Sequence, residues 1–392
     1  MPPISETPKA QREPHLARPK RLLELDALRV LGVILILVHH LVGYTYSPSL
    51  VELVARIDYH IFPLFFLGLS LFFFVSGYAL YHNYTTFSTG RAVGGFLKRR
   101  AIRIYPLYWI AIAAFILLGI GAWGNDIWWI IAQICGAQGL LAPRFGTPVI
   151  TLWFIGVILL FYLTYPLVVS FSSSSKRLVI GLMIPLLLFV ALRVAFNLVD
   201  FRFFVYYALF FGGVLVSKYD VFNRYAVKPS YVVVSVLLLI GTLVLIENMG
   251  LFDARLHAFF YSGFDTAASL LTTRTILAIV LADILALIFV YTTFTLSRLI
   301  LPSLSSTARK AIAGIAFSTY CAYLFHRPIL VLLAEALNAT HLLALQKTVL
   351  IIICGIPLIF VVGYAIQRGW NSLLAKAVPQ GQPHARRVAQ TK

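Results

Sequence analysis

Two histidines stand in long apolar segments of the chain, and each has an arginine on its own segment. Arg29 and His40 are eleven residues apart, and eleven residues of α-helix return the second side chain to within about 20° of the first. They would share a helix face, about 16 Å apart along the axis, whereas His39 would lie about 80° away. Asp26 could pair with Arg29. Alternatively, Asp26 and Arg29 cap a helix end and His40 is a structural histidine.

The second histidine lies in the segment Tyr323-Leu-Phe-His326-Arg327-Pro328. Tyr323 and His326 are three residues apart and would share one face of a helix. Ionisable side chains are costly inside a membrane, so each is a candidate functional residue. His40 and His326 fall at similar depths in their segments, which predicts that they line one polar cavity. The alternative is a structural hydrogen-bond network beside a proline kink.

A third cluster is cationic and reads Lys98-Arg99-Arg100-Ala-Ile-Arg103. Arg99 and Arg103 would share a helix face, with Arg100 beside them. Arginine side chains bind phosphate with two parallel hydrogen bonds, so the cluster predicts a phosphate clamp at the cytoplasmic surface. The alternative is the ordinary excess of basic residues that flanks membrane segments.

Composition decides what kind of element must position these residues. Of 392 residues, 60% are hydrophobic and 12% are charged, against about 25% charged in soluble domains. A membrane span needs about 20 mostly apolar residues. Ten segments approach that length: Leu25–Tyr46, Ile61–His82, Ile104–Trp123, Val149–Phe171, Leu178–Phe196, Phe203–Ser217, Tyr231–Ile246, Ile276–Leu296, Ala311–Leu337 and Thr348–Ile366. We therefore predict an all-α integral membrane protein, a polytopic bundle of about ten transmembrane helices. Polar residues interrupt Trp128–Leu141, which we interpret as an interfacial or re-entrant piece.

The basic residues predict the orientation of this bundle. With both termini cytoplasmic, 23 of the 32 Lys and Arg residues fall in inside segments, seven in outside segments and two within spans. This asymmetry is typical of the cytoplasmic side of a membrane protein, so it also accounts for the formal charge of +18 without nucleic-acid binding. We predict a disordered basic cytoplasmic tail at 1–20, a transmembrane domain at 21–370 and a basic cytoplasmic tail at 371–392.

The cysteines predict neither a disulfide framework nor a zinc site. Cys135, Cys321 and Cys354 are isolated in the sequence and form no CxxC pair. No bound cofactor and no metal site are predicted.

Five segments, in order along the chain, are similar to the motifs of one membrane-enzyme family. They are Leu25-Asp26-Ala-Leu-Arg29 with His40 after ten more residues; Leu71-Phe-Phe-Phe-Val-Ser76-Gly77; Phe96-Leu-Lys-Arg99-Arg100-Ala-Ile-Arg103-Ile-Tyr-Pro106; Leu152-Trp153-Phe154 with Phe161-Tyr162-Leu-Thr-Tyr-Pro166; and Tyr320-Cys-Ala-Tyr323-Leu-Phe-His326-Arg-Pro328. Together they resemble membrane-bound acyltransferase family 3, whose members O-acylate glycans and similar acceptors.

The resemblance implies a co-substrate and an acceptor. The donor would be cytoplasmic acyl-CoA, most often acetyl-CoA, and the acceptor a hydroxyl of a glycan or lipid-linked sugar, commonly at the outer face of the cell membrane. Arg99, Arg100 and Arg103 would hold the donor phosphates, and Arg29 would assist from the inner end of its span.

The resemblance also implies catalytic roles. His40 would be the general base that takes the proton of the acceptor hydroxyl, or would itself form an acyl-histidine intermediate. His326 with Tyr323 would orient the acceptor or stabilise the oxyanion. Ser76 is interpreted as a packing position beside Gly77 rather than a nucleophile, because its segment shows no adjacent base.

The chain departs from the family pattern at one place, and there are two alternatives to the acyltransferase function. Many relatives carry acidic residues in the fourth span, where this chain has Ile158 and Leu159, so no fourth-span catalytic carboxylate is expected. A transporter or flippase could also line a pathway with histidine and arginine. A catalytically inactive export accessory with the same fold is the third possibility.

Overall fold

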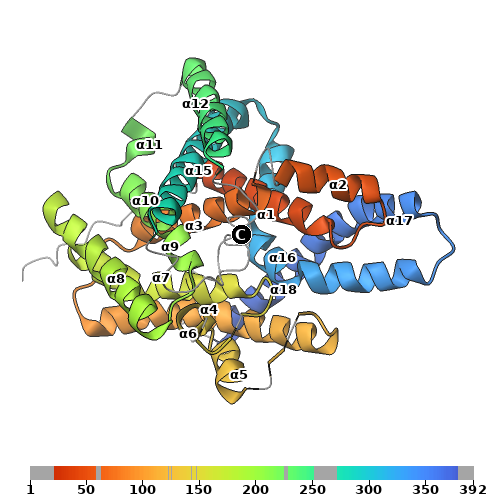
Figure 1. Ribbon diagram of the computed structural model, residues 1–392, viewed down its shortest axis with the longest axis horizontal. Helices are drawn as coiled ribbons and strands as arrows, with labels where there is room; N and C mark the ends of the chain where they lie inside the picture. The colour runs from red at the N-terminus through yellow and green to blue at the C-terminus, as the bar shows by residue number, and fades with distance from the viewer. Residues whose placement is uncertain are drawn as a thin grey trace, which may run out of the picture.

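The computed structural model describes residues 22–58, 63–121, 123–124, 126–142, 144–146, 148–224, 228–250 and 272–377. All regular elements in these ranges are helical (Figure 1). The predicted tail at 1–20 and most of the one at 371–392 lie outside the described residues. The last helix runs past the predicted boundary at residue 370 to Ala377.

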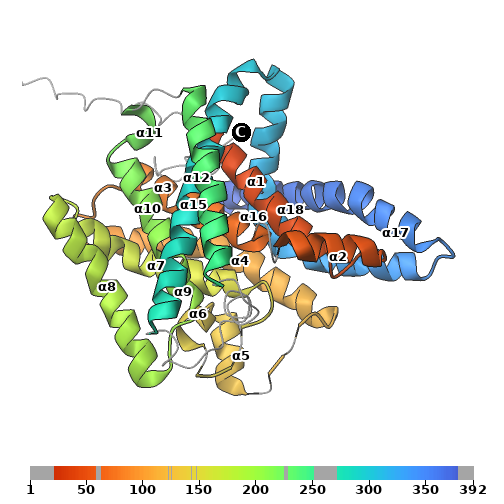
Figure 2. The ribbon, with the colours of Figure 1, turned by 45° about the horizontal axis from the view of Figure 1, so that its top comes forward.

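The centre of the bundle is built from helices that come from distant parts of the chain. They are α1 (Leu23–Leu41), α3 (Leu64–Asn83), α7 (Trp153–Ser170), α10 (Tyr207–Lys218) and α16 (Ser306–Asn338). Helix α3 is apolar around its whole circumference, and such a helix must be buried on all sides. It packs between α1 and α10, while α1 also contacts α16 (Figure 2).

Longer helices surround this centre. They are α4 (Gly90–Leu117), α8 (Ser175–Phe196), α12 (Pro229–Asn248), α15 (Thr273–Ile300) and the continuous pair α17 (Ala344–Leu350) and α18 (Ile356–Ala377), joined by a π-helical turn at Ile351–Gly355. Their outward faces are apolar: Leu237 of α12 is 63% exposed and Val361 of α18 is 66% exposed. Lipid, unlike water, solvates such faces at no cost.

Short helices connect the long ones. They are α2 (Pro48–Arg56), α5 (Ile127–Ile134), α6 (Gln138–Leu141), α9 (Arg202–Val205), α11 (Val221–Arg224) and the 3-10 turn η2 (Leu301–Ser303). Helices α2 and α17 lie together at one end of the bundle in Figures 1 and 2. The Tyr46 hydroxyl donates to the Ala334 carbonyl at 2.8 Å and so fastens the start of this α2 segment to α16.

The predicted polytopic, all-α fold is confirmed. Eight helices in the described residues are long and apolar enough to cross a membrane. The two other predicted spans correspond to α1 and to α9 with α10. Helix α1 has 19 residues but includes Glu24, Asp26 and Arg29, and α10 has 12 residues, about 18 Å of helix against a hydrocarbon core of about 30 Å. That these two cross the bilayer stays a prediction.

The interrupted segment Trp128–Leu141 forms α5 and α6 rather than a full span, as its composition predicts. Its glutamines point inward and are buried. The Gln138 side-chain amide donates to the Tyr108 hydroxyl at 3.0 Å and to the Leu152 carbonyl at 3.1 Å. Buried amides need such partners, so the polar residues that break the apolar pattern attach this segment to α4 and to the start of α7.

Two of the seven basic residues assigned to outside segments, Arg193 and Arg202, are not surface residues. Arg193 is 1% exposed and Arg202 is 4% exposed. Arg193 donates to the Val199 carbonyl at 3.0 Å, and Arg202 pairs with Asp200. Charge counting cannot distinguish a solvated flanking arginine from one that folds back into the protein, so these two carry no orientation information.

Glycines set the closest helix crossings. A Cβ on Gly77 of α3 would lie 1.9 Å from the Phe210 carbonyl oxygen of α10, and a Cβ on Gly213 would lie 2.1 Å from the Phe74 carbonyl oxygen. A Cβ on Gly32 of α1 would lie 2.9 Å from the Gly68 carbonyl oxygen of α3. Small residues allow helix backbones to meet in membranes, and here they join α1, α3 and α10.

Gly77→Ala is expected to destabilise the protein because its methyl group cannot fit against the α10 backbone. Over-packing of this kind costs about 1–3 kcal/mol or more, and thermal unfolding of the purified protein measures it. Gly314→Ala is the control, since a Cβ at Gly314 of α16 would meet no atom within 4 Å. Equal unfolding temperatures for the two variants would contradict the predicted contact.

Candidate active site

His40 and His326 meet at the centre of the described bundle, as predicted from their depths. Their rings are stacked, with centroids 5.0 Å apart and planes inclined by 17°. His40 is 8% exposed and His326 is 0% exposed. His40 lies in the last turn of α1, which ends at Leu41 rather than at the predicted Tyr46, while His326 lies inside α16.

Arg327 holds the His40 ring. Its Nη2 lies 3.0 Å from His40 Nδ1. Its Nε donates to the Thr151 hydroxyl at 2.5 Å, and its Nη1 donates to the Tyr44 hydroxyl at 3.3 Å. Arg327 therefore joins α16 to the end of α1 and to the turn that precedes α7. In the sequence, Arg327 is an arginine within a predicted span, and its spacing predicts no role for it.

His326 is held by its own helix. Its Nδ1 lies 2.7 Å from the carbonyl oxygen of Tyr323, one turn earlier in α16. Within the described part of the chain, the Nε2 atoms of both His40 and His326 are buried and have no hydrogen-bond partner. Buried polar atoms are nearly always paired, so two unpaired nitrogens on stacked rings mark the place where a substrate could bind.

Thr151 fixes the geometry of this site from the loop before α7. The Tyr323 hydroxyl donates to its carbonyl oxygen at 2.6 Å, and Arg327 donates to its hydroxyl. Thr151 has a φ of 71°, a conformation that a β-branched residue rarely adopts. Such strain persists only where the surroundings impose it, often at functional sites. Thr151 could not be predicted from the sequence, because no residue pattern signals a threonine with positive φ.

His39 also lies at this site, although helix arithmetic set it aside. Its Nδ1 is 2.9 Å from the Asp58 carboxylate, which comes from the segment between α2 and α3. Its ring meets the His40 ring edge-on, with centroids 4.8 Å apart. Asp58 is 7% exposed. A half-buried histidine paired with a buried aspartate thus backs the stacked histidines, and only the tertiary contact reveals it.

A second buried pair, Asp200 and Arg202, supports the site through aromatic rings. The Arg202 guanidinium donates to both Asp200 carboxylate oxygens, at 2.7 and 2.5 Å, and lies 4.0 Å above the Trp153 ring. The Trp153 ring packs on Phe65 at 6.1 Å, and Phe65 packs on His40 at 5.5 Å. No motif in the sequence indicates this support.

The other predicted residues lie nearer the opposite ends of these helices. Asp26 and Arg29 form the expected ion pair at 3.2 Å. Arg29 is about 16 Å from His40 along α1 by helix rise, so the two share a face without touching. Ser76 is half-buried beside Gly77 at the α10 crossing, a position in keeping with a packing role.

The arginine cluster lies on α4 against aromatic rings. The Arg100 guanidinium lies over Tyr84, Phe96 and Tyr162 at 5.5–5.6 Å from the ring centroids. Its buried Nε has no partner in the described part of the chain, whereas Arg103 is exposed.

The cluster connects to the histidines through α16. The Tyr320 hydroxyl of α16 donates to the Ile104 carbonyl at 3.0 Å, directly after Arg103. From Tyr320 to His326 is about 9 Å along the helix. The point where α4 meets α16 and the histidine pair are therefore about two turns apart along the axis of α16.

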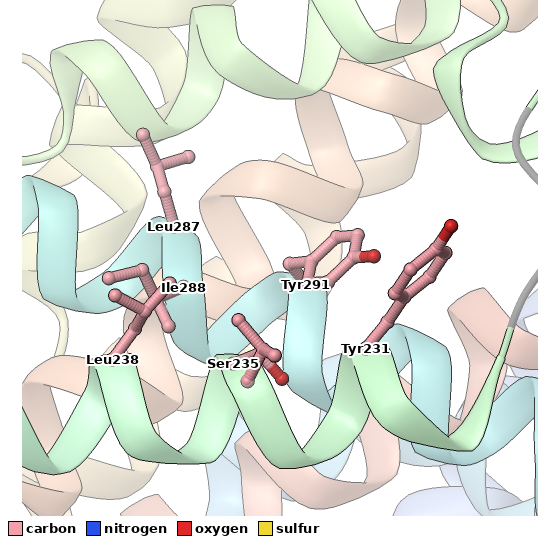
Figure 3. Close-up of a pocket in the computed structure, with 7 residues that line it drawn as sticks. Tyr231, Ser235, Leu238, Leu287, Ile288 and Tyr291 are labelled. Carbon is pink, nitrogen blue, oxygen red and sulfur yellow. The ribbon is translucent and has the colours of Figure 1, made fainter.

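An apolar groove elsewhere carries none of this chemistry. It has a volume of about 490 Å³ between α12 and α15 (Figure 3). It is lined by Tyr231, Val234, Ser235, Leu238, Leu287, Ile288 and Tyr291, none of which belongs to the predicted site. No group of three His, Cys, Asp or Glu side chains in the described ranges could hold a metal ion.

The comparison with known protein families agrees with this geometry. A family model described as an acyltransferase domain matches residues 22–368, which include both histidines, the arginine cluster and all eight candidate membrane-spanning helices up to Arg368. No significant match is found among curated proteins or among solved structures. A match that covers this much of the chain defines its family. The protein belongs to membrane-bound acyltransferase family 3.

Proposed function

We propose that the protein transfers an acyl group, expected to be acetyl, from acyl-CoA to a hydroxyl of a glycan or lipid-linked sugar. The observation that carries the proposal is the buried, stacked pair of His40 and His326, whose Nε2 atoms have no hydrogen-bond partner among the described residues, in a chain of an acyltransferase family. Imidazole nitrogens suit this reaction because a hydroxyl must lose a proton as it attacks a thioester.

The arginine cluster on α4 is the proposed donor site. Arg99, Arg100 and Arg103 would bind the phosphates of acyl-CoA, and Arg29 would assist from α1. The aromatic rings around Arg100 hold its guanidinium in place, and no described residue bonds to its Nε. An extended pantetheine arm can span the two turns of α16 between this cluster and the histidines.

The proposed orientation places donor and acceptor on opposite sides of the cytoplasmic membrane. The excess of basic residues in the predicted inside segments supports cytoplasmic termini. The arginine cluster then faces the cytoplasm, where acyl-CoA is made, and the acceptor would approach from the outer face. Because Ile158 replaces the acidic residue of many relatives and is 3% exposed, the proposed chemistry relies on histidines rather than on a fourth-span carboxylate.

The direct test is acyl transfer by the purified protein in lipid nanodiscs with radiolabelled acetyl-CoA. Wild-type protein is expected to release CoA and to label a glycan or lipid extract, and His40→Ala is expected to lose this activity while folded. A deletion strain should lack one acyl group on a surface glycan or lipid by mass spectrometry. An unchanged surface profile together with no CoA release would overturn the proposed function.

The donor site makes a separate prediction. Arg103→Gln is expected to raise the KM for acyl-CoA about tenfold with little change in kcat, because a charge-assisted hydrogen bond worth about 1.5 kcal/mol is lost. Arg91→Gln, at an exposed position earlier on α4, is the matched control. S-acetylpantetheine lacks the phosphates of acyl-CoA, so its KM should be the same for wild-type protein, Arg103→Gln and Arg91→Gln. An increased KM for both donors would contradict a phosphate site at Arg103.

A further inference from the structure

The partners of the two histidine rings determine which nitrogen of each carries the proton. Arg327 Nη2 lies 3.0 Å from His40 Nδ1. A guanidinium has donors and no acceptor, so His40 Nδ1 must accept this hydrogen bond with its lone pair. A neutral imidazole has a single N–H. The proton of neutral His40 is therefore on Nε2, the nitrogen with no hydrogen-bond partner in the part of the chain that the structure describes.

His326 has the opposite arrangement. Its Nδ1 lies 2.7 Å from the Tyr323 carbonyl oxygen. A carbonyl oxygen only accepts, so His326 Nδ1 must donate and therefore carries the proton. The lone pair of neutral His326 is then on Nε2, which also has no partner among the described residues. The two stacked rings thus present one N–H and one lone pair.

The surrounding contacts fix both arrangements. Arg327 is held by the Thr151 and Tyr44 hydroxyls, and an arginine stays charged in proteins. Its positive charge also opposes protonation of His40, because two cations 3.0 Å apart in a buried site repel each other strongly. The partner of His326 is a backbone carbonyl of its own helix, which is present in every state in which α16 is folded.

We infer that His326 is the general base of the proposed reaction and that His40 is a neutral N–H donor to the oxyanion. Arg327 is the positioning residue, because its hydrogen bond to His40 Nδ1 keeps the His40 proton on Nε2. The inference rests on the proposed function and reverses the roles expected from the family resemblance. It also argues against an acyl-His40 intermediate, because a nucleophilic Nε2 needs the lone pair that His40 has on Nδ1.

The reaction balances with these roles. His326 Nε2 takes the proton of the acceptor hydroxyl as the oxygen bonds to the thioester carbon. The carbonyl oxygen becomes an oxyanion and accepts a hydrogen bond from His40 Nε2–H. Collapse of this intermediate breaks the carbon–sulfur bond, and protonated His326 returns its proton to the leaving thiolate. The products are the acyl ester and CoA, and both histidines are again neutral.

Glutamine substitutions separate the two roles, because a glutamine amide can donate a hydrogen bond but cannot take a proton. His40→Gln is expected to retain about a tenth of the wild-type rate, whereas His40→Ala loses about 100-fold or more, the effect of deleting an oxyanion donor. His326→Gln is expected to be as inactive as His326→Ala. The inference is overturned if His326→Gln retains activity and His40→Gln does not, or if both are as inactive as the alanine variants.

The pH dependence tests the positioning role of Arg327. In wild-type protein and in His40→Gln, the rate should fall on the acid side with a single ionisation, that of His326. Arg327→Met should add a second ionisation, that of His40, because the guanidinium then no longer opposes its protonation, while the His39–Asp58 pair and the His326 ring still lie beside it. Arg327→Lys should restore the single ionisation. A purely structural role for Arg327 would lower the rate of Arg327→Met without changing the shape of its profile.

The inference can also be tested on wild-type protein, without variants that must fold. Nitrogen chemical shifts of ¹⁵N-histidine distinguish the two neutral tautomers, and backbone correlations assign them to His40 and His326. His40 protonated at Nε2 and His326 protonated at Nδ1 is the expected result, and the reverse would overturn the inference. Wild-type protein that shows these tautomers but transfers no acyl group from any acyl-CoA would instead reject the proposed function.

Discussion

His326→Ala is expected to lower the rate of acyl transfer by about 1,000-fold, within the range that positioned acid–base groups contribute to catalysis. The substitution removes the only lone pair that the stacked rings present towards a substrate, since the His40 lone pair is engaged by Arg327. The measurement is release of CoA from saturating acyl-CoA and acceptor by the purified protein. His341→Ala, at an exposed position after α16, should keep wild-type activity.

Chemical rescue separates a lost base from a damaged fold. His326 is 0% exposed, so alanine leaves a cavity of about the size of an imidazole ring. Free imidazole is expected to restore part of the activity of His326→Ala and none of that of His326→Gln, in which the amide fills the space. Folding is checked by thermal unfolding of each variant. Activity of His326→Ala near the wild-type level without imidazole would exclude His326 as the base.

Asp200→Ala is expected to destabilise the protein by about 3–5 kcal/mol, which is the cost of leaving a buried charge without its partner. The side chains of Asp200 and Arg202 are 2% and 5% exposed. Loss of the carboxylate leaves the Arg202 guanidinium over the Trp153 ring, where no water can reach it in the wild-type packing. Equilibrium unfolding in mixed micelles measures the free energy of unfolding.

Two controls make this prediction specific to burial. Glu52→Ala removes an exposed ion pair, in which the side chains of Glu52 and Arg56 are 64% and 70% exposed, and should cost less than about 1 kcal/mol. The double variant Asp200→Leu with Arg202→Met should recover most of the lost stability, since apolar replacement of a whole buried pair is often nearly neutral. An Asp200→Ala cost equal to that of Glu52→Ala would contradict the buried pair.

The helical segments could be predicted from sequence because each depends on local composition. Runs of apolar residues match α3, α4, α7, α8, α12, α15, α16 and the α17–α18 helix to within several residues at most ends. Helix ends were less predictable, because α1 stops at Leu41 where the chain turns into α2. The short span expected at Phe203–Ser217 is divided into α9 and α10 for a similar reason, since Tyr206 breaks the helix there.

The site could be predicted in part. His40, His326 and Tyr323 stand out in the sequence because polar side chains are rare in apolar segments. Asp58 and Asp200 do not, because each lies in a connecting segment, where polar residues are ordinary. Thr151 does not either, because an uncharged threonine at the N-terminal end of the predicted span Val149–Phe171 is ordinary. They become site residues only through contacts with helices distant in the chain.

The sequence by itself determined the membrane solvent, the helical class, the family motifs and the two histidines, since these follow from residue type and local spacing. Only the tertiary structure decided how the histidines differ. A proton on Nδ1 or Nε2 depends on which group faces the ring, and for His40 that group is Arg327, far along the chain on another helix. The spacing of residues within one helix determines the face on which a histidine lies. The nitrogen that carries its proton depends on the partner that tertiary packing brings to the ring.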